Sequence, residues 1–415
     1  MRFDEYQIAE GIKKSLAKQG FKKPTDIQFK SIPAILKEED VLAIAQTGTG
    51  KTAAFAIPII HKIHIRKLIK QSSGVKCLVM APTHELAIQI DKVFKNLSKH
   101  TKVKSTCVYG GVSRVQQQEI LKDGVDIIIA TPGRLFDLAK RQILDLRNLD
   151  TLVLDEADHM LDLGFIDDIK ELMRYVPKDR QTLFFSATID EHIKKLAYAM
   201  VDKKSAIRIQ LSPKDPVAKN IEHAVAFIEM DDKRFFLANF IQMHPEQKIL
   251  VFVRTKVRAE RVKKALEREE IHSITLHGDK LQNERDEAMV KFRQGEELVL
   301  ITTDISARGI DIPNVEYVIN YDLPESSEHY IHRVGRTGRG TNKGQALSFC
   351  SSEEQIILEE LDRDLGKPIL RLELSKGDYA LTVEEQKEAQ LTDWKSLIEN
   401  EENKKVRRKR NDNYR

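Results

Sequence analysis

The chain has 415 residues, 41% of them apolar, and its net charge of only +4 gives little sign of a polyanionic partner. Since a hydrophobic core rarely grows past about 250–300 residues, this length predicts two globular domains. The isolated cysteines Cys77, Cys107 and Cys350 exclude a disulfide framework and a paired-cysteine zinc site, so we expect a reduced, cytoplasmic protein.

The N-terminal stretch MRFDEYQIAE lacks the apolar segment of a signal peptide, and no run of about 18 apolar residues predicts a membrane span. Short apolar strands then alternate with helices, such as those expected at 84–100 and 189–201. Strands that are apolar on both faces and separated by helices are typical of a parallel sheet covered on both sides, an α/β fold. The strands predicted here are residues 40–45, 76–83, 104–110, 125–131, 150–156 and 181–188.

The alternation is interrupted once and then restarts. Residues 211–220 contain two prolines and no periodicity, which predicts a linker. Beyond residue 372 the pattern fades into a charged stretch with one tryptophan, Trp394, which is either helical or disordered. The second set of predicted strands is 248–255, 272–278, 297–304, 315–322 and 344–351. We therefore expect domains at 1–210 and 221–372, a linker at 211–220 and a tail at 373–415.

The first strong strand leads into a candidate phosphate loop, AIAQTGTGKTAAF. Gly48 and Gly50 let the backbone turn its N–H groups inward, Lys51 brings a positive charge to the β- and γ-phosphates, and Thr52 offers a hydroxyl to Mg²⁺. Ala45 stands where the strict motif has its first glycine. The alternative is an ordinary glycine-rich turn before a helix, which the order of strand, loop, GKT and helix disfavours.

The strand at 150–156 ends in closely spaced carboxylates. Asp155, Glu156 and Asp158 would repel one another unless a positive charge lies among them. Mg²⁺ on a nucleoside triphosphate would supply that charge, held by Asp155 mostly through water. Glu156 would position the attacking water, and Asp158 either contacts neighbouring motifs or begins the next helix.

In their order, these motifs resemble those of the DEAD-box ATP-dependent RNA helicases of superfamily 2. The sequence DEAD follows AQTGTGKT and precedes SAT (186–188) and HRVGRTGRG (332–340). The resemblance extends over residues 1–370 and, within the family, is similar to the bacterial RhlE-like group. It implies two tandem RecA-like domains, each a parallel sheet flanked by helices, and a short basic C-terminal tail.

The resemblance also implies which residues form an ATP site. The Gln28 amide can donate and accept together, as adenine recognition needs, and Phe21 offers a face for stacking. The implied ATP-binding residues are Phe21, Gln28, Gln46, Thr47, Gly48, Thr49, Gly50, Lys51, Thr52 and Asp311. Thr52 and Asp155 are assigned to Mg²⁺, Lys51, Glu156, Arg336 and Arg339 to catalysis, and Asp158, Ser186, Thr188 and His332 to coupling between the domains.

These assignments divide the catalytic groups between the domains. Arg336 and Arg339 are implied to be arginine fingers, worth roughly 10³–10⁵ in rate, although a basic turn that binds surface carboxylates is the structural alternative. Lys51 and Glu156 belong to the other domain, so hydrolysis is expected to require domain closure.

Other motifs of the family are implied to hold the RNA backbone without reading its sequence. They lie at strand ends and helix starts, where N–H groups and hydroxyls can bind phosphates. The implied residues are Pro82, Thr83, His84, Gly111, Thr131, Pro132, Gly133, Arg134, Arg254, Gly278, Arg285 and Thr303. His84 replaces the family's usual arginine, which predicts a weaker phosphate contact. The basic run 404–410 is either a solvated tail or an RNA anchor.

The sequence thus predicts an ATP-dependent RNA helicase, a monomeric core with ATP and Mg²⁺ as cofactors that separates short RNA duplexes locally. Two rivals remain. A non-catalytic RNA clamp is disfavoured by Glu156, Arg336 and Arg339, and a DNA translocase of the same superfamily is disfavoured by the DEAD sequence and Gln28. The sequence selects no particular RNA.

Overall fold

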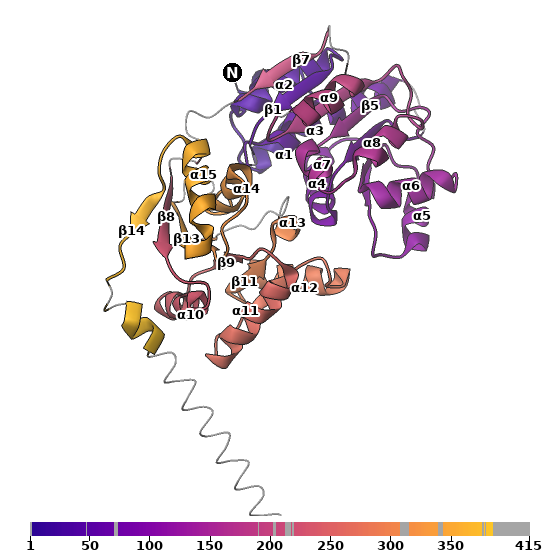
Figure 1. Cartoon of the computed structure of the whole chain (residues 1–415). Helices are drawn as coiled ribbons and strands as arrows, with labels where there is room; N and C mark the ends of the chain where they lie inside the picture. The colour runs from indigo at the N-terminus through magenta and orange to yellow at the C-terminus, as the bar shows by residue number, and fades with distance from the viewer. Residues whose placement is uncertain are drawn as a thin grey trace, which may run out of the picture. The chain divides into compact units, whose positions relative to one another are not determined.

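The computed structural model describes residues 2–46, 48–69, 74–189, 191–201, 205–211, 217, 220–307, 315–338, 343–375, 377 and 379–384. These residues form two compact units, one within Met1–Pro216 and the other from Val217 onward (Figure 1).

The first unit is built on a seven-stranded sheet in which all neighbouring strands are parallel. The order across the sheet is β3-β4-β2-β5-β6-β1-β7. The strands are β1 (Val41–Ile44), β2 (Cys77–Met80), β3 (Ser105–Val108), β4 (Ile127–Ala130), β5 (Thr151–Leu154), β6 (Gln181–Ser186) and β7 (Ile207–Gln210). Each of the six predicted strands is present, and the prediction of a parallel sheet is confirmed.

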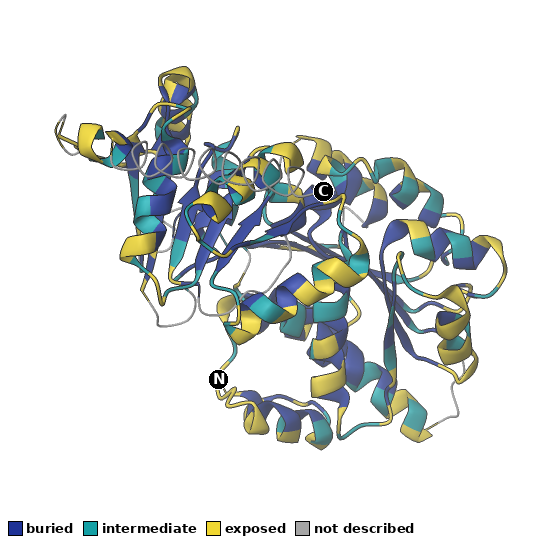
Figure 2. Ribbon diagram, turned by 90° about the horizontal axis from the view of Figure 1, so that it is seen from below, coloured by how far each residue is buried: buried dark blue, intermediate teal, exposed yellow. Residues whose placement is uncertain are grey.

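Apolar layers cover both faces of this sheet because successive residues of a strand face opposite sides. Ile127 belongs to the layer that contains Phe55, whereas Ile128 belongs to the layer that contains Leu135. The inner strands of the sheet are buried and the outer faces of the helices are exposed (Figure 2). The helices are α1 (Glu10–Lys18), α2 (Asp26–Leu36), α3 (Lys51–Ile69), α4 (His84–Ser98), α5 (Arg114–Lys122), α6 (Pro132–Lys140), α7 (Ala157–Asp162), α8 (Ile166–Leu172) and α9 (Glu191–Met200). The predicted helices at 84–100 and 189–201 are α4 and α9.

The second unit is built on another all-parallel sheet of seven strands, in the order β10-β11-β9-β12-β13-β8-β14. Its strands are β8 (Ile221–Phe227), β9 (Ile249–Phe252), β10 (Ile274–Leu276), β11 (Val299–Thr302), β12 (Tyr317–Asn320), β13 (Gly344–Cys350) and β14 (Leu370–Leu372). Its helices are α10 (Lys233–Met243), α11 (Lys256–Arg268), α12 (Gln282–Gln294), α13 (Asp304–Ala307), α14 (Ser327–Val334) and α15 (Gln355–Leu365). All five strands predicted in this half are present. Across the described ranges, no helix has both the length and the apolar character needed to cross a membrane.

The two sheets have the same strand order. When the strands of each unit are numbered from its own start, both sheets run 3-4-2-5-6-1-7. β8 therefore takes the place of β1, β12 the place of β5, and β13 the place of β6. This correspondence lets each loop of one unit be matched with a loop of the other.

Three strands, β7, β8 and β14, were not predicted from the sequence. β7 has one buried residue, Ile209, among four, so its apolar run is too short to stand out. β14 is exposed at Leu370 and Leu372, and β8 includes the polar pair Glu222 and His223. The apolar pattern is weak in all three strands because much of their length is exposed or only partly buried.

The predicted linker and tail are described only in part. Within 211–220 the structure describes residues 211, 217 and 220, and the tail is described as far as residue 384. Tyr379 packs on the second unit, with its ring 4.9 Å from that of Phe236 and its hydroxyl donating to Asp232 Oδ2 at 2.8 Å. Trp394 and the basic run 404–410 lie outside the described residues.

Candidate functional site

The phosphate loop, the DEAD sequence and the SAT sequence come together at one edge of the first sheet. In that sheet β6 pairs with β1 on one side and with β5 on the other. Residues 45–50 follow β1, Asp155 follows β5, and Ser186 ends β6. The carboxyl ends of parallel strands meet at a single edge, which is where α/β sheets bind ligands. Motifs far apart in the sequence are therefore neighbours here.

The phosphate loop turns through two glycines. Gly48 has φ +81° and Gly50 has φ +91°, a backbone conformation that other residues rarely adopt. Thr49 Oγ1 donates a hydrogen bond to the carbonyl of Gln46 at 2.8 Å and closes the turn. Thr47 lies outside the described residues.

Gln28 fastens this loop to α2. Its Nε2 donates a hydrogen bond to the Gly50 carbonyl at 3.1 Å, and its Oε1 accepts one from the backbone N–H of Thr25 at 3.0 Å. A Cβ at Gly50 would lie 2.5 Å from Gln28 Nε2, so any larger residue here would displace this amide. The side chain predicted to read adenine thus also holds the loop. Phe21, the predicted stacking ring, is 52% exposed.

Lys51 is a buried cation whose charge is not met by a hydrogen bond. It is the first residue of α3 and is 6% exposed. Among the described residues, its Nζ has no hydrogen-bond partner. Burying an ammonium without a paired group is costly, so this position is built for an anion. Thr52 follows it on the same helix.

Two carboxylates at this edge, those of Asp155 and Glu156, need a positive charge nearby, just as Lys51 needs a negative one. Asp155 is fully buried, and burial raises its pKa to about 7, with Lys51 opposing this shift and Glu156 adding to it. Glu156 begins the turn into α7 with φ +52°, a conformation uncommon for a non-glycine residue. Its carboxylate lies 3.6 Å from Nδ1 of His159, a buried residue that the sequence analysis did not single out. Carboxylate and hydroxyl oxygens are the ligands that Mg²⁺ prefers, so Asp155 and Thr52 fit this ion.

Asp158 joins the DEAD and SAT sequences within the first unit. Its Oδ2 accepts hydrogen bonds from the backbone N–H groups of Ala187 at 2.9 Å and Thr188 at 3.1 Å, and from Thr188 Oγ1 at 3.3 Å. Ser186 Oγ is buried and, within the described ranges, has no hydrogen-bond partner. Asp158 therefore ties the DEAD sequence directly to SAT.

The arginine motif of the second unit is only partly described. Arg336 is buried, and its Nε donates a hydrogen bond to the His332 carbonyl at 3.2 Å. The hydroxyl of Thr337 donates to the carbonyl of Val315 at 2.6 Å, so this loop lies where β12 begins. Arg339 and Asp311, two predicted site residues, lie outside the described residues.

A third arginine of this motif, Arg333, is held inside the second unit. Its Nε and Nη2 donate to the carboxylate of Asp304 at 2.6 and 2.7 Å, and its Nη1 donates to the carbonyl of Asp322 at 2.6 Å. Because Asp304 directly follows Thr303, a residue predicted to bind RNA, Arg333 connects the arginine motif with the loop after β11.

The RNA-binding residues predicted in the first unit follow β2, β3 and β4, which are adjacent in the sheet. Thr83 Oγ1 caps α4 by accepting from the Leu86 N–H at 3.3 Å. The His84 ring lies 5.3 Å from that of Tyr109. Arg134 donates to Gln117 Oε1 at 2.7 Å and to the Val112 carbonyl at 3.1 Å, so this predicted RNA ligand also ties α6 to the loop after β3.

The other predicted residues of this surface surround those contacts. Pro82 is buried, and Gly111 has φ +80°. Thr131 precedes α6, Pro132 opens it, and Gly133 is exposed. The sheet order thus separates the strands that lead to the predicted ATP-binding residues, β5-β6-β1, from a predicted RNA half, β3-β4-β2.

The second unit places its predicted RNA-binding residues on the matching strands. Arg254 follows β9, Gly278 follows β10 and Thr303 follows β11, and these strands are adjacent. The Arg254 side chain is 42% exposed. Arg285 lies on α12 and is half-buried.

Comparison with known proteins agrees with this arrangement. The chain matches the DEAD/DEAH box helicase family over residues 25–196 and the helicase conserved C-terminal domain over residues 232–341. It is 39% identical to the DEAD-box ATP-dependent RNA helicase RhpA of Helicobacter pylori, covering 90% of this chain and 74% of that protein. It is also 39% identical to the ATP-dependent RNA helicase CshA of Listeria monocytogenes, covering 91% and 72%.

A solved structure resembles the chain along nearly its whole length. Saccharomyces cerevisiae Dbp5 bound to RNA and ADP BeF3 superposes with a TM-score of 0.79 at 31% identity, covering 93% of this chain and 99% of that one. The tandem RecA-like fold implied by the sequence motifs is therefore confirmed.

Proposed function

The chain belongs to the DEAD-box ATP-dependent RNA helicase family, and from this premise we propose how its own residues couple ATP hydrolysis to local separation of RNA strands. The observation that carries the proposal is the buried Nζ of Lys51, which has no hydrogen-bond partner among the described residues and whose charge acts on the carboxylate of Asp155. A buried cation of this kind, at an edge that also carries closely spaced carboxylates, suits a triphosphate that arrives with Mg²⁺.

ATP is held at the carboxyl ends of β1, β5 and β6. Lys51 meets the β- and γ-phosphates, and the N–H groups of the loop around Gly48 and Gly50 point toward them. Phe21 and Gln28 recognise adenine. Since Gln28 already bonds to Gly50, an adenine bound by this amide would also fix the phosphate loop.

Asp155 and Thr52 hold Mg²⁺ in this proposal. When bound, Mg²⁺ neutralises phosphate charge and lets the two carboxylates remain ionised side by side. The support comes from the site itself: burial raises the pKa of Asp155 to about 7 and Glu156 adds to this shift, although the charge of Lys51 opposes it.

Hydrolysis uses residues of both units. Glu156 orients and polarises the attacking water, while Arg336 and Arg339 stabilise the charge that develops on the transferred phosphate. The state of the nucleotide is coupled to the arrangement of the domains through Asp158, Ser186, Thr188 and His332. Because no single unit carries all these groups, domain closure is required for turnover, and RNA that favours closure stimulates it.

RNA is bound through its backbone by loops of both units. In the first unit these follow β2, β3 and β4, and in the second they follow β9, β10 and β11. Bending of one strand in the closed state separates a short stretch of duplex. We further propose a monomeric core that works in the cytoplasm and chooses its RNA through the tail or a partner.

Steady-state ATPase of the parent chain and of Glu156→Gln, with and without RNA, tests this proposal. RNA should stimulate the parent, and the variant should lose roughly 10²–10⁴-fold in turnover while still binding RNA. DNA of the same sequence should stimulate less. An RNA-independent rate, or none in the parent, would instead favour an ATP-gated clamp, and equal stimulation by DNA would favour a DNA translocase.

A further inference from the structure

Lys233 is the residue of the second unit that matches Lys51. The two sheets have the same order, and β8 takes the place of β1. Residues 45–50 lead from β1 to α3, which begins at Lys51, and residues 228–232 lead from β8 to α10, which begins at Lys233. A lysine therefore opens the matching helix in each unit, although the second loop contains no glycine.

Lys233, unlike Lys51, is fully supplied with acceptors. It is 0% exposed, and its Nζ donates to the Tyr321 carbonyl at 2.8 Å, to the Phe349 carbonyl at 3.1 Å and to the carboxylate of Glu354. These carbonyls stand at the carboxyl ends of β12 and β13, the counterparts of β5 and β6. An ammonium has three protons to donate, and all three are used.

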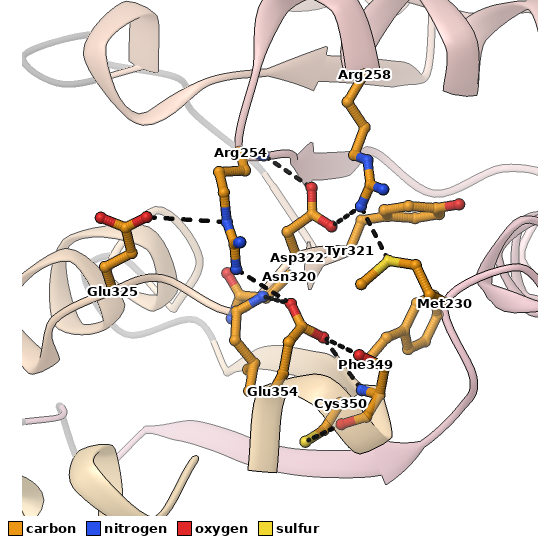
Figure 3. A network of polar contacts seen from close by, with 12 residues as sticks. Met230, Arg254, Arg258, Asn320, Tyr321, Asp322, Glu325, Phe349, Cys350 and Glu354 are labelled. Carbon is orange, nitrogen blue, oxygen red and sulfur yellow. Dashed lines mark hydrogen bonds and ion pairs between the residues drawn. The ribbon is translucent and has the colours of Figure 1, made fainter. Parts of the chain in front are cut away.

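The Glu354 carboxylate collects the kinds of donor that a phosphate site offers. Besides Lys233, it accepts from the backbone N–H of Leu323 at 3.1 Å and from the N–H and hydroxyl of Ser351, both at 3.1 Å. It also accepts from Arg254 Nη2 at 3.5 Å (Figure 3). Lysine, arginine, hydroxyl and backbone N–H groups are the donors that hold phosphates in nucleotide sites. Burial opposes ionisation of Glu354, but Lys233 and the backbone N–H groups of Ser351 and Leu323 together hold the pKa of this carboxyl below its usual range.

The other groups of this edge are satisfied in the same way. Asp322 follows β12 much as Asp155 follows β5, and its carboxylate accepts from the Arg254 N–H at 2.8 Å and pairs with Arg258 (Figure 3). Ser186 Oγ, at the end of β6, has no hydrogen-bond partner among the described residues, whereas the hydroxyl of Ser351, just past β13, donates to Glu354. The second edge thus has a lysine and an aspartate where the first edge has Lys51 and Asp155, but here the chain itself supplies the partner of each charge.

We propose that the second unit contains an anion-binding site that is occupied by its own side chain, Glu354. The carboxylate of Glu354 takes the place beside Lys233 that phosphate takes beside Lys51. The site would accept a small carboxylate in place of the side chain. Since Glu354 also reaches Arg254 and the loop after β12, this internal ligand holds a predicted RNA-binding loop in place without any nucleotide.

Chemical rescue tests the proposal. Glu354→Ala removes the carboxylate and leaves space beside Lys233, and the matched control Lys233→Met/Glu354→Ala lacks the cation as well. Glu354→Gln keeps the space filled with a neutral amide. The melting temperature of each full-length variant and of the parent is measured in acetate and in chloride at equal ionic strength. All four proteins keep the phosphate loop of the first unit, so any effect of acetate on that loop is the same in each of them.

Acetate should raise the melting temperature of Glu354→Ala alone, by about 3–5 °C at ten times its dissociation constant. If Glu354→Ala does not fold in chloride, refolding in acetate should recover it and should not recover the double variant. The proposal is overturned if acetate stabilises all four proteins equally, if it leaves Glu354→Ala unchanged, or if neither salt recovers that variant.

Discussion

The carboxyl edges of the two sheets differ in whether the chain satisfies its own polar groups. At the first edge, Lys51 Nζ and Ser186 Oγ have no hydrogen-bond partner among the described residues. At the second, Lys233 has three acceptors, and the Ser351 hydroxyl donates to Glu354. The strand order is the same in both sheets. The fold therefore positions these groups, and the loop residues decide whether the edge awaits a ligand or is closed by its own side chains.

The largest expected effect comes from the same substitution at the two matching lysines. Lys51→Met should abolish ATPase without lowering stability, because it removes a buried charge that has no hydrogen-bond partner in the described part of the chain. Lys233→Met should destabilise the second unit by about 3–5 kcal/mol, because it leaves Glu354 buried without its cation. Denaturant unfolding of both variants measures the contrast, and equal losses of stability would break the comparison.

The paired substitution Lys233→Met/Glu354→Leu sharpens this result. Replacing both members of a buried ion pair with apolar side chains is often neutral or stabilising. The pair should therefore recover most of the stability that Lys233→Met loses. A double variant as unstable as the single one would mean that backbone contacts, rather than charge, hold this edge.

Lowering the pH should destabilise the second edge by protonating Glu354. Its folded pKa is lowered by Lys233, although burial opposes this, so its contribution to stability is complete above the unfolded value of about 4.3 and is lost as pH falls through the folded value. Lys233 and Arg254 are the charged groups that contact it. Unfolding free energies of the parent and of Lys233→Met/Glu354→Leu, measured across this range, should fall more steeply for the parent. Parallel curves would contradict this.

A smaller effect is expected at His84, on the RNA half of the first edge. Its ring lies beside Tyr109, and an imidazole lacks the forked N–H groups with which arginine holds phosphate. His84→Arg should add one phosphate contact and steepen the dependence of RNA affinity on salt by about 0.7 on logarithmic axes. Binding titrations at several salt concentrations measure this slope. An unchanged affinity and slope would show that the side chain does not reach the phosphates.

The smallest expected effect concerns the basic end of the chain. Removing residues 404–415 should raise the RNA concentration that gives half-maximal ATPase and leave the maximal rate unchanged, because Lys and Arg contacts add affinity that is independent of RNA sequence. A truncated chain with the parent's half-saturation would identify the run as a solvated tail.

The sequence predicted the first edge far better than the second. The glycines and the GKT sequence of the phosphate loop are local signals, and the strands beside them are continuous apolar runs. Lys233 lies in DDKRFF without such a motif, and its partner Glu354 is 121 residues away. The strand order of the second sheet brings them together. β8, the strand that leads to Lys233, was among the three strands that were not predicted.

The roles of single residues were also beyond the sequence. Arg134 belongs to a motif associated with RNA, yet its guanidinium is bonded to Gln117 and Val112. Gln28 was expected only to recognise adenine, yet it is also hydrogen-bonded to the phosphate loop. Such contacts depend on where neighbouring loops lie, and no spacing rule within one segment reports that.

The most direct test of the difference between the edges is the number of nucleotides bound per chain. Calorimetric titration with a non-hydrolysable ATP analogue should give one site, lost in Lys51→Met and kept in Lys233→Met/Glu354→Leu. Two sites in the parent, or loss of binding in the second-unit pair with Lys51 intact, would contradict the account.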